Sequence, residues 1–96
     1  MKIASTAVGD ELHALCLSNS GTIFHTICRE GNRWDHWTPL HPGGDFMEVS
    51  CAAVGSTLHV LAITDQGLCM HRTRDKDGKW TEFEKLHDQP RFEHGG

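Results

Sequence analysis

Short apolar runs separated by polar, glycine-containing turns recur along the whole chain. In the first half these runs are about 6 to 8 residues long and occupy positions 3–8, 12–17, 22–29 and 34–40. Apolar runs of this length, bounded by Gly, Asn and Asp, are typical of β-strands joined by hairpin turns. No helical periodicity extends beyond a single turn. The pattern therefore predicts an all-β protein built from consecutive antiparallel strands.

The second half of the chain repeats this pattern without a gap. A shift of 46 residues places Gly21 on Gly67 and Trp34 on Trp80, and 13 of the 46 aligned positions are identical. Self-similarity at a period of 40 to 50 residues, with four strands in each period, is typical of β-propeller blades. We therefore expect two four-stranded antiparallel blades, residues 1–46 and 47–92, followed by a C-terminal tail at 93–96.

Side-chain size along each repeat agrees with a blade. The first strand is rich in Ala and Ser, as expected of the innermost strand, where blades crowd together at the central axis. The last strand carries large rings, which would fill the wedge between blades that splay apart: Trp34, Trp37, Trp80 and Phe83. The strands are apolar on both faces, which indicates sheets that are packed on both sides.

Two blades cannot close a ring, and alone they would expose two apolar faces. We therefore expect the chain to close into a full propeller by homo-oligomerisation with cyclic symmetry. Six blades from a trimer are the first expectation and eight blades from a tetramer the second.

Charge and composition exclude several other classes of partner. The formal net charge is −4 and the basic residues form no run, which argues against nucleic-acid binding. No apolar run is long enough to span a bilayer, and no signal segment is seen at the N-terminus. The four cysteines form no C-x-x-C pair, and no cysteine aligns with a cysteine in the other copy. We expect free thiols and, by default, a cytoplasmic protein, with secretion by a non-classical route as the alternative.

Histidines and aromatic residues are the candidates for chemistry. Six of the eight histidines align in pairs between the copies: His13/His59, His25/His71 and His41/His87. Their spacing matches no local zinc motif, so we expect no metal ion and no cofactor. The first two pairs are expected to join neighbouring strands by hydrogen bonds. His41/His87 begin the loop after each blade and are expected to be exposed. For the aligned aromatic residues, sugar stacking and wedge filling remain two open interpretations.

The stretch from Gly21 to Trp37, with its counterpart from Gly67 to Phe83, resembles the repeat of tectonin- and tachylectin-like β-propeller lectins. Such repeats run Gly, two apolar residues, His, then Arg and Gly-x-Trp-x-x-aromatic. The resemblance covers both copies and implies a sugar-binding ring. Arg74 stands three residues after His71, as in that pattern, whereas Cys28 takes this place in copy one. Arg29 is displaced by one residue onto the opposite face of its strand. If this arginine contacts the ligand, we expect the site of copy one to be inactive.

The resulting prediction is a carbohydrate-binding lectin with shallow, multivalent sites for glycans or monosaccharides between blades. The predicted sugar-binding residues are Trp34, Trp37, His41, His71, Arg74, Trp80, Phe83 and His87. The alternative is a self-assembling scaffold, or an engineered or reconstructed propeller fragment, without a dedicated ligand. No catalytic motif is present, so we expect no enzyme activity.

Overall fold

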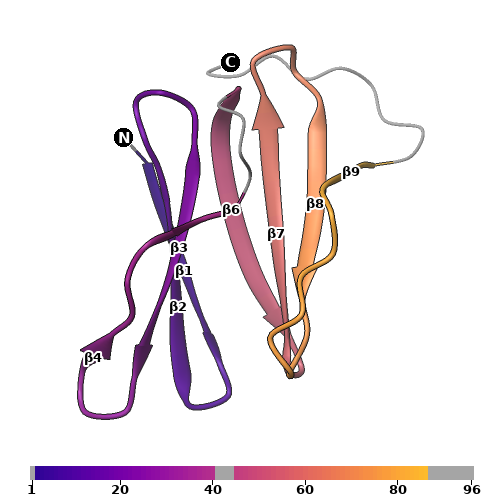
Figure 1. Ribbon diagram of the computed structural model, residues 1–96. Helices are drawn as coiled ribbons and strands as arrows, with labels where there is room; N and C mark the ends of the chain where they lie inside the picture. The colour runs from indigo at the N-terminus through magenta and orange to yellow at the C-terminus, as the bar shows by residue number, and fades with distance from the viewer. Residues whose placement is uncertain (1, 41–44, 87–96) are drawn as a thin grey trace.

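The computed structural model describes residues 2–40 and 45–86, which form two antiparallel sheets and no helix (Figure 1). The first sheet has the order β1-β2-β3-β4, with β5 also paired to β3: β1 (Lys2–Val8), β2 (Glu11–Leu17), β3 (Ile23–Arg29), β4 (Arg33–Trp34) and β5 (Thr38–Pro39). The second sheet has the order β6-β7-β8-β9: β6 (Phe46–Val54), β7 (Thr57–Thr64), β8 (Cys69–Arg74) and β9 (Glu84–Lys85). The all-β prediction is confirmed. Within the described ranges no segment is a helix of the length and apolar character that crossing a membrane requires.

The two sheets have the same register at equivalent positions of the repeat. In the first sheet Leu15 pairs with His25, and in the second sheet Leu61 pairs with His71. The hairpins between the first two strands of each sheet turn at Gly9 and Gly55, whose φ values are +59° and +61°. Glycine adopts such a φ at less cost than residues with a Cβ atom, which agrees with its presence at this position in both copies.

The fourth predicted strand differs from the prediction. Residues 34–40 do not form one continuous strand, because only two short stretches, β4 and β5, pair with β3. The second sheet has the equivalent interruption, with an isolated bridge from Arg74 to Trp80 and then β9. In the first sheet Pro39 has no N–H to donate, which limits the ladder at this edge.

Each sheet has two chemically distinct faces. Directly paired residues of antiparallel strands lie on the same face, so the pairing of His13 with Ile27 and of Leu15 with His25 places both histidines together. We call this the histidine face, and its equivalent in the second sheet carries His59 and His71. The opposite face carries Trp34 in the first sheet, and we call it the tryptophan face.

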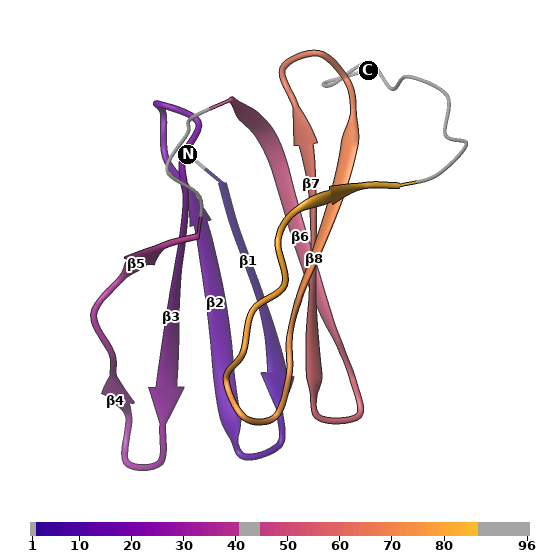
Figure 2. The same ribbon diagram turned by 45° about the vertical axis from the view of Figure 1, so that its right-hand side comes forward.

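The histidine face of the first sheet packs against the tryptophan face of the second. Strand β6 lies against β1 and β2, and Figure 2 shows β1 beside β6 with β4 and β5 at the far edge. The buried core draws on both sheets: Leu15, Leu17, Ile23, Leu40, Phe46, Leu58, Val60 and Ala62. Trp80 and Phe83 pack against this core from the edge of the second sheet. The core therefore lies between the sheets, and each sheet contributes a different face.

The two remaining faces are open. On the histidine face, Leu15 is 0% exposed, whereas its repeat counterpart Leu61 is 39% exposed. On the tryptophan face, Leu58 is 1% exposed and its counterpart Leu12 is 39% exposed. The open surfaces include further large apolar side chains at Ile3, Trp34 and Val54. Leu12 and Leu61 are thus exposed, whereas their counterparts in the other copy, Leu58 and Leu15, are buried.

This difference predicts unequal effects of truncating Leu15 and Leu61 in the monomeric chain. Leu15→Ala leaves a cavity in the core and should lower the free energy of unfolding by about 2–5 kcal/mol. Leu61→Ala removes a side chain that is already partly in solvent and should cost less than about 1.5 kcal/mol. Denaturant unfolding of dilute, monomeric protein measures both values. Equal losses would contradict the packing described above.

Candidate functional site

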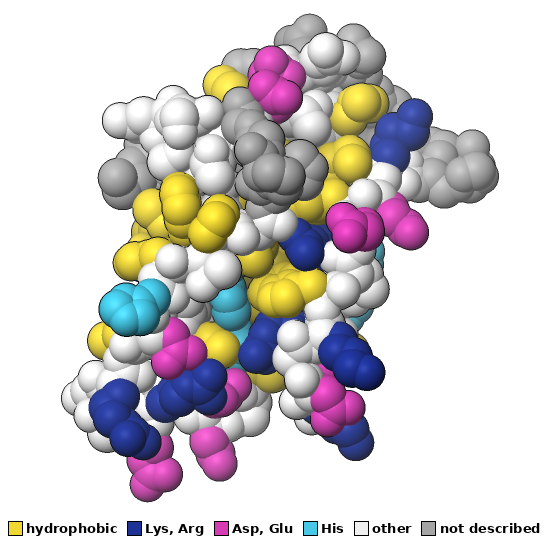
Figure 3. Space-filling view, viewed as in Figure 1, with side chains coloured by type: hydrophobic (Ala, Val, Ile, Leu, Met, Phe, Trp, Pro, Cys, Tyr) yellow, Lys and Arg dark blue, Asp and Glu magenta, His cyan; other side chains and the backbone are white. Residues whose placement is uncertain are grey.

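A cleft of about 270 Å³ opens between the two sheets at the edge away from β1 and β6. Both sheets line it: His25, Ile27, Arg29, Asp35, Thr38, Pro39 and Leu40 from the first, and Arg72, Arg74, Gly78 and Trp80 from the second. Figure 3 shows charged side chains gathered over the lower part of this face, with apolar and histidine side chains visible between the sheets. The cleft combines one aromatic ring with several hydrogen-bonding and charged groups.

Arg29 binds the two acidic side chains on the first sheet's side of the cleft. Its guanidinium donates to both carboxylate oxygens of Asp35, at 3.2 and 2.9 Å, and to the Glu11 carboxylate at 2.7 Å. The hydrogen bond from Arg29 holds the pKa of Asp35 below its ordinary value, so this carboxyl group is ionised at neutral pH. A bidentate pair of this kind fixes the planes of both groups.

Arg72 joins the two sheets. Its guanidinium donates to the Leu40 carbonyl oxygen of the first sheet and, through Nε at 2.5 Å, to the Thr81 carbonyl oxygen of its own. The same group lies over the rings of Trp80 and Phe83, 5.0 and 5.4 Å from their centroids. Burial lowers the pKa of Arg72, although the group remains cationic. Its counterpart Thr26 makes the equivalent bond to the Asp35 carbonyl oxygen at 2.7 Å.

Arg74 lies in the same cleft without a bound carboxylate among the described residues. Its Nη2 atom is 3.1 Å from the point that a Cβ atom would occupy at Gly78. Gly78 therefore leaves the space in which this guanidinium lies against the turn. The carboxylate of the neighbouring Asp75 accepts backbone N–H bonds from Asp77 and Lys79, each at 2.9 Å.

A chain of hydrogen bonds connects Glu11 to the cleft through two histidines. Nε2 of His13 is 3.1 Å from the Glu11 carboxylate, and Nδ1 of His13 is 2.9 Å from Nε2 of His25. An ionised carboxylate only accepts, so a neutral His13 carries its proton on Nε2 and accepts at Nδ1. His25 therefore donates from Nε2. Burial, together with the charges of His13 and Arg74, lowers the pKa of His25 to about 4, so both histidines are neutral at neutral pH.

The second sheet repeats this histidine contact on its open face. Nδ1 of His59 is 2.9 Å from Nε2 of His71, and the two rings stack with centroids 5.1 Å apart. The prediction that these aligned histidines join neighbouring strands by hydrogen bonds is confirmed in both copies. His71, one of the predicted sugar-binding residues, is thus engaged in this pair and does not line the cleft.

The structure brings two of the eight predicted sugar-binding residues, Arg74 and Trp80, together in the cleft. Phe83 lies next to them, beneath Arg72 and against Phe46 with ring centroids 5.0 Å apart. Trp34 and Trp37 do not line the cleft and are 53% and 48% exposed on the first sheet. The remaining two predicted residues, His41 and His87, lie outside the described residues.

The cleft also contains residues that the sequence analysis did not select. Arg72 was missed, although it lies two residues before Arg74 and so shares its face of the strand. Arg29 was expected on the face opposite to that of Cys28, and the register confirms this. The sequence did not indicate that opposite faces of the two copies pack together. This packing places Arg29 and Arg74 in the same cleft. The repeat did not indicate Asp35 as a site residue, because the aligned residue in copy two is Thr81.

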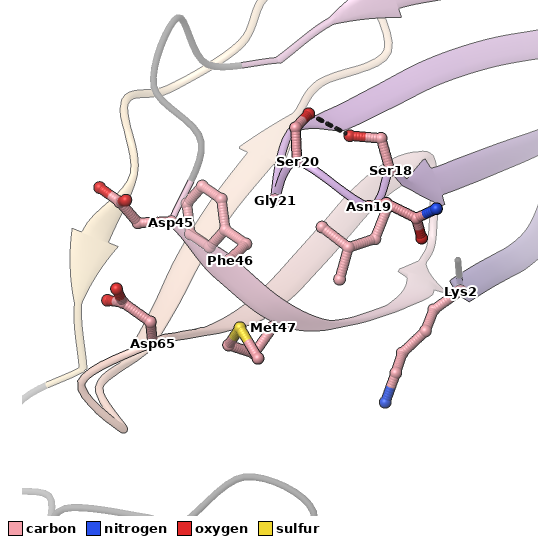
Figure 4. Close-up of a pocket in the computed structure, with 10 residues that line it drawn as sticks. Lys2, Ser18, Asn19, Ser20, Gly21, Asp45, Phe46, Met47 and Asp65 are labelled. Atoms are coloured by element: carbon pink, nitrogen blue, oxygen red, sulfur yellow. Dashed lines mark hydrogen bonds between the residues drawn. The ribbon is translucent and has the colours of Figure 1, made fainter.

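A second hollow of about 210 Å³ lies at another end of the sheets, beside the turn at residues 18–21 (Figure 4). Lys2, Asp45 and Asp65 are among its lining residues, and none of the eight predicted residues is. Within residues 2–40 and 45–86, no cluster of three or more His, Cys, Asp or Glu side chains is arranged to hold a metal ion. Cys16, Cys28, Cys51 and Cys69 are thiols half-buried in strands β2, β3, β6 and β8.

The lowered histidine pKa predicts that stability falls as the pH is reduced from about 6.5 to about 4. In this range the unfolded chain binds a proton at His25 that the folded chain does not, so protonation favours unfolding. The loss should reach on the order of 3 kcal/mol at pH 4. Urea unfolding at a series of pH values measures this slope. The ion-paired Asp35 adds a loss that begins as the pH falls below about 5, and this part of the slope is shared by the control variant.

His25→Gln is the matched control, because the Gln amide can still donate to His13 but does not titrate. The slope between pH 6.5 and 4 should become shallower in this variant. An unchanged slope, or a His25 that titrates near 6.5 by NMR, would contradict the described burial of this ring.

Comparison of the chain with protein-family models, with curated proteins and with solved structures finds no match. The likeness to tectonin- and tachylectin-like repeats therefore rests on this chain's own residues.

Proposed function

We propose that this chain is a carbohydrate-binding lectin whose two sheets are propeller blades, and that several chains close into a ring with one shallow site in each cleft between blades. The observation that carries the proposal is the composition of the cleft. The half-buried Trp80 lines the cleft together with the donors and acceptors of Arg74, Asp35 and Thr38. Sugar sites commonly combine an aromatic surface for the C–H groups with a few placed polar groups for the hydroxyls.

Ring closure is supported by the complementarity of the open faces. The histidine face of the second sheet retains His59, Leu61 and His71 at the positions that His13, Leu15 and His25 occupy in the packed face. The tryptophan face of the first sheet retains Leu12 and Trp34 at the positions of Leu58 and Trp80. A second chain can therefore repeat the packing seen within one chain.

Such a contact is heterologous, because it joins two different surfaces. Heterologous contacts between identical chains produce either a closed ring or an open filament. Closure removes both exposed apolar faces, and a ring of three chains with six blades is our first expectation, with four chains second. Sites repeated around the ring would raise avidity without new contacts.

The second candidate function is a self-assembling scaffold without a dedicated ligand. One observation favours it: the Trp80 ring is already engaged, with Arg72 over one face and His25 edge-on at 5.1 Å between centroids. A tryptophan used in this way serves packing between the sheets. Sugar binding and assembly must therefore be measured separately.

Face-blocking variants test the assembly. Leu12→Glu places a charge on the open tryptophan face and Leu61→Glu places one on the open histidine face, where each wild-type side chain is partly exposed. Each variant alone should remain monomeric. An equimolar mixture should form a 1:1 pair, because each variant keeps the face that the other lacks. Sedimentation velocity measures this outcome, and self-association of either variant alone would contradict the heterologous contact.

Sugar binding is tested with a glycan array and competition by free monosaccharides. The assembled wild-type protein should bind at least one glycan, and Trp80→Ala should reduce the affinity at least tenfold while the native mass stays unchanged. Loss of the assembly in Trp80→Ala would favour the scaffold. Binding to no glycan by the assembled wild-type protein would refute the lectin proposal.

A further inference from the structure

The charges in the cleft do not balance. Three guanidinium groups line it, from Arg29, Arg72 and Arg74. Among the described residues that line it, Asp35 is the one acidic residue, and Arg29 binds both Asp35 and the neighbouring Glu11. Asp75 and Glu82 interact electrostatically with Arg74 and Arg72, respectively, but do not line the cleft. His25 adds no charge, since burial lowers its pKa to about 4. The residues that line the cleft therefore carry an excess of positive charge in a chain whose formal net charge is −4.

The arginine that can bind an anion in this cleft is Arg74 rather than Arg72. Arg72 is used by the fold: its guanidinium donates to carbonyl oxygens of both sheets and lies over two aromatic rings. Arg74 forms no ion pair with any carboxylate of the described residues. Arg74 is half-buried, and its Nη2 atom lies against Gly78. The parallel N–H donors of a guanidinium group can bind two oxygen atoms of one anionic group.

We propose that the sugar recognised in this cleft is acidic, and that Arg74 binds its anionic group while the sugar ring lies beside Trp80. This inference rests on the proposed function. The anionic group is a carboxylate, as in a uronic acid, or a sulfate ester, because both present two or more oxygens to a guanidinium. Copy one has Cys28 at the position of Arg74, so a cleft formed between chains lacks this group. The ring therefore carries one acidic-sugar site per chain.

The test compares glucuronic acid, glucose 6-sulfate and glucose by NMR titration of the assembled protein. At least one of the two acidic sugars should bind ten times or more tightly than glucose, with one site per chain, and this preference should weaken as salt is raised. The better acidic ligand identifies the anionic group. Glucose bound as tightly as both acidic sugars would overturn this inference and leave the lectin proposal standing. Binding of none of the three sugars or of any arrayed glycan would refute both.

Arg74→Gln should remove the preference for the acidic sugar, so that its affinity falls to that of glucose. Arg33→Gln is the matched control, because it removes the same charge from the exposed strand β4, outside the cleft. Arg74→Lys keeps the charge without the parallel N–H donors and should retain part of the preference. An unchanged preference in Arg74→Gln would overturn the assignment, as would two acidic-sugar sites per chain.

Discussion

The packing of the first sheet's histidine face on the second sheet's tryptophan face is the contact on which the structure depends. It buries Leu15 and Ile23 against Leu58 and Val60, and it aligns the edges that form the cleft. Because the two copies contribute different faces, each copy is left with the face that the other uses. The burial that stabilises one chain thus also leaves two apolar surfaces in solvent, and the proposed function has a second chain cover them.

The same asymmetry explains how a duplicated sequence acquires unequal chemistry. Positions that keep the fold are identical in both copies, such as the paired histidines, whose contact distances agree at 2.9 Å. Most residues that line the cleft differ from their counterparts in the other copy, with His25, Leu40 and Trp80 as the exceptions. In addition, one copy presents its histidine face to the cleft and the other its tryptophan face. Arg74 therefore faces Arg29 and Asp35, and not a copy of itself. The 46-residue repeat thus provides two walls of different composition.

Much of the fold follows from the sequence, because strand length, turn glycines and the 46-residue repeat are local properties. The first three strands of each copy and the histidine hydrogen bonds were predicted in this way. The interruption between β4 and β5 was not, since it depends on how residues 35–37 leave the sheet. Of the site, the sequence indicated Arg74 and Trp80 but missed Arg72 and Asp35. The internal repeat shows which residues of the two copies occupy equivalent positions. A site between the sheets combines residues from non-equivalent positions, so the repeat does not indicate it.

The native mass of the wild-type chain tests the central claim most directly. If the two open faces are complementary, the chain should form a closed oligomer of defined size, with three copies as the expected number, and concentrations in the tens of micromolar should leave little monomer. Native mass spectrometry and sedimentation equilibrium both measure this. A chain that stays monomeric at these concentrations would contradict the account, because two exposed apolar faces would then have no partner in solution.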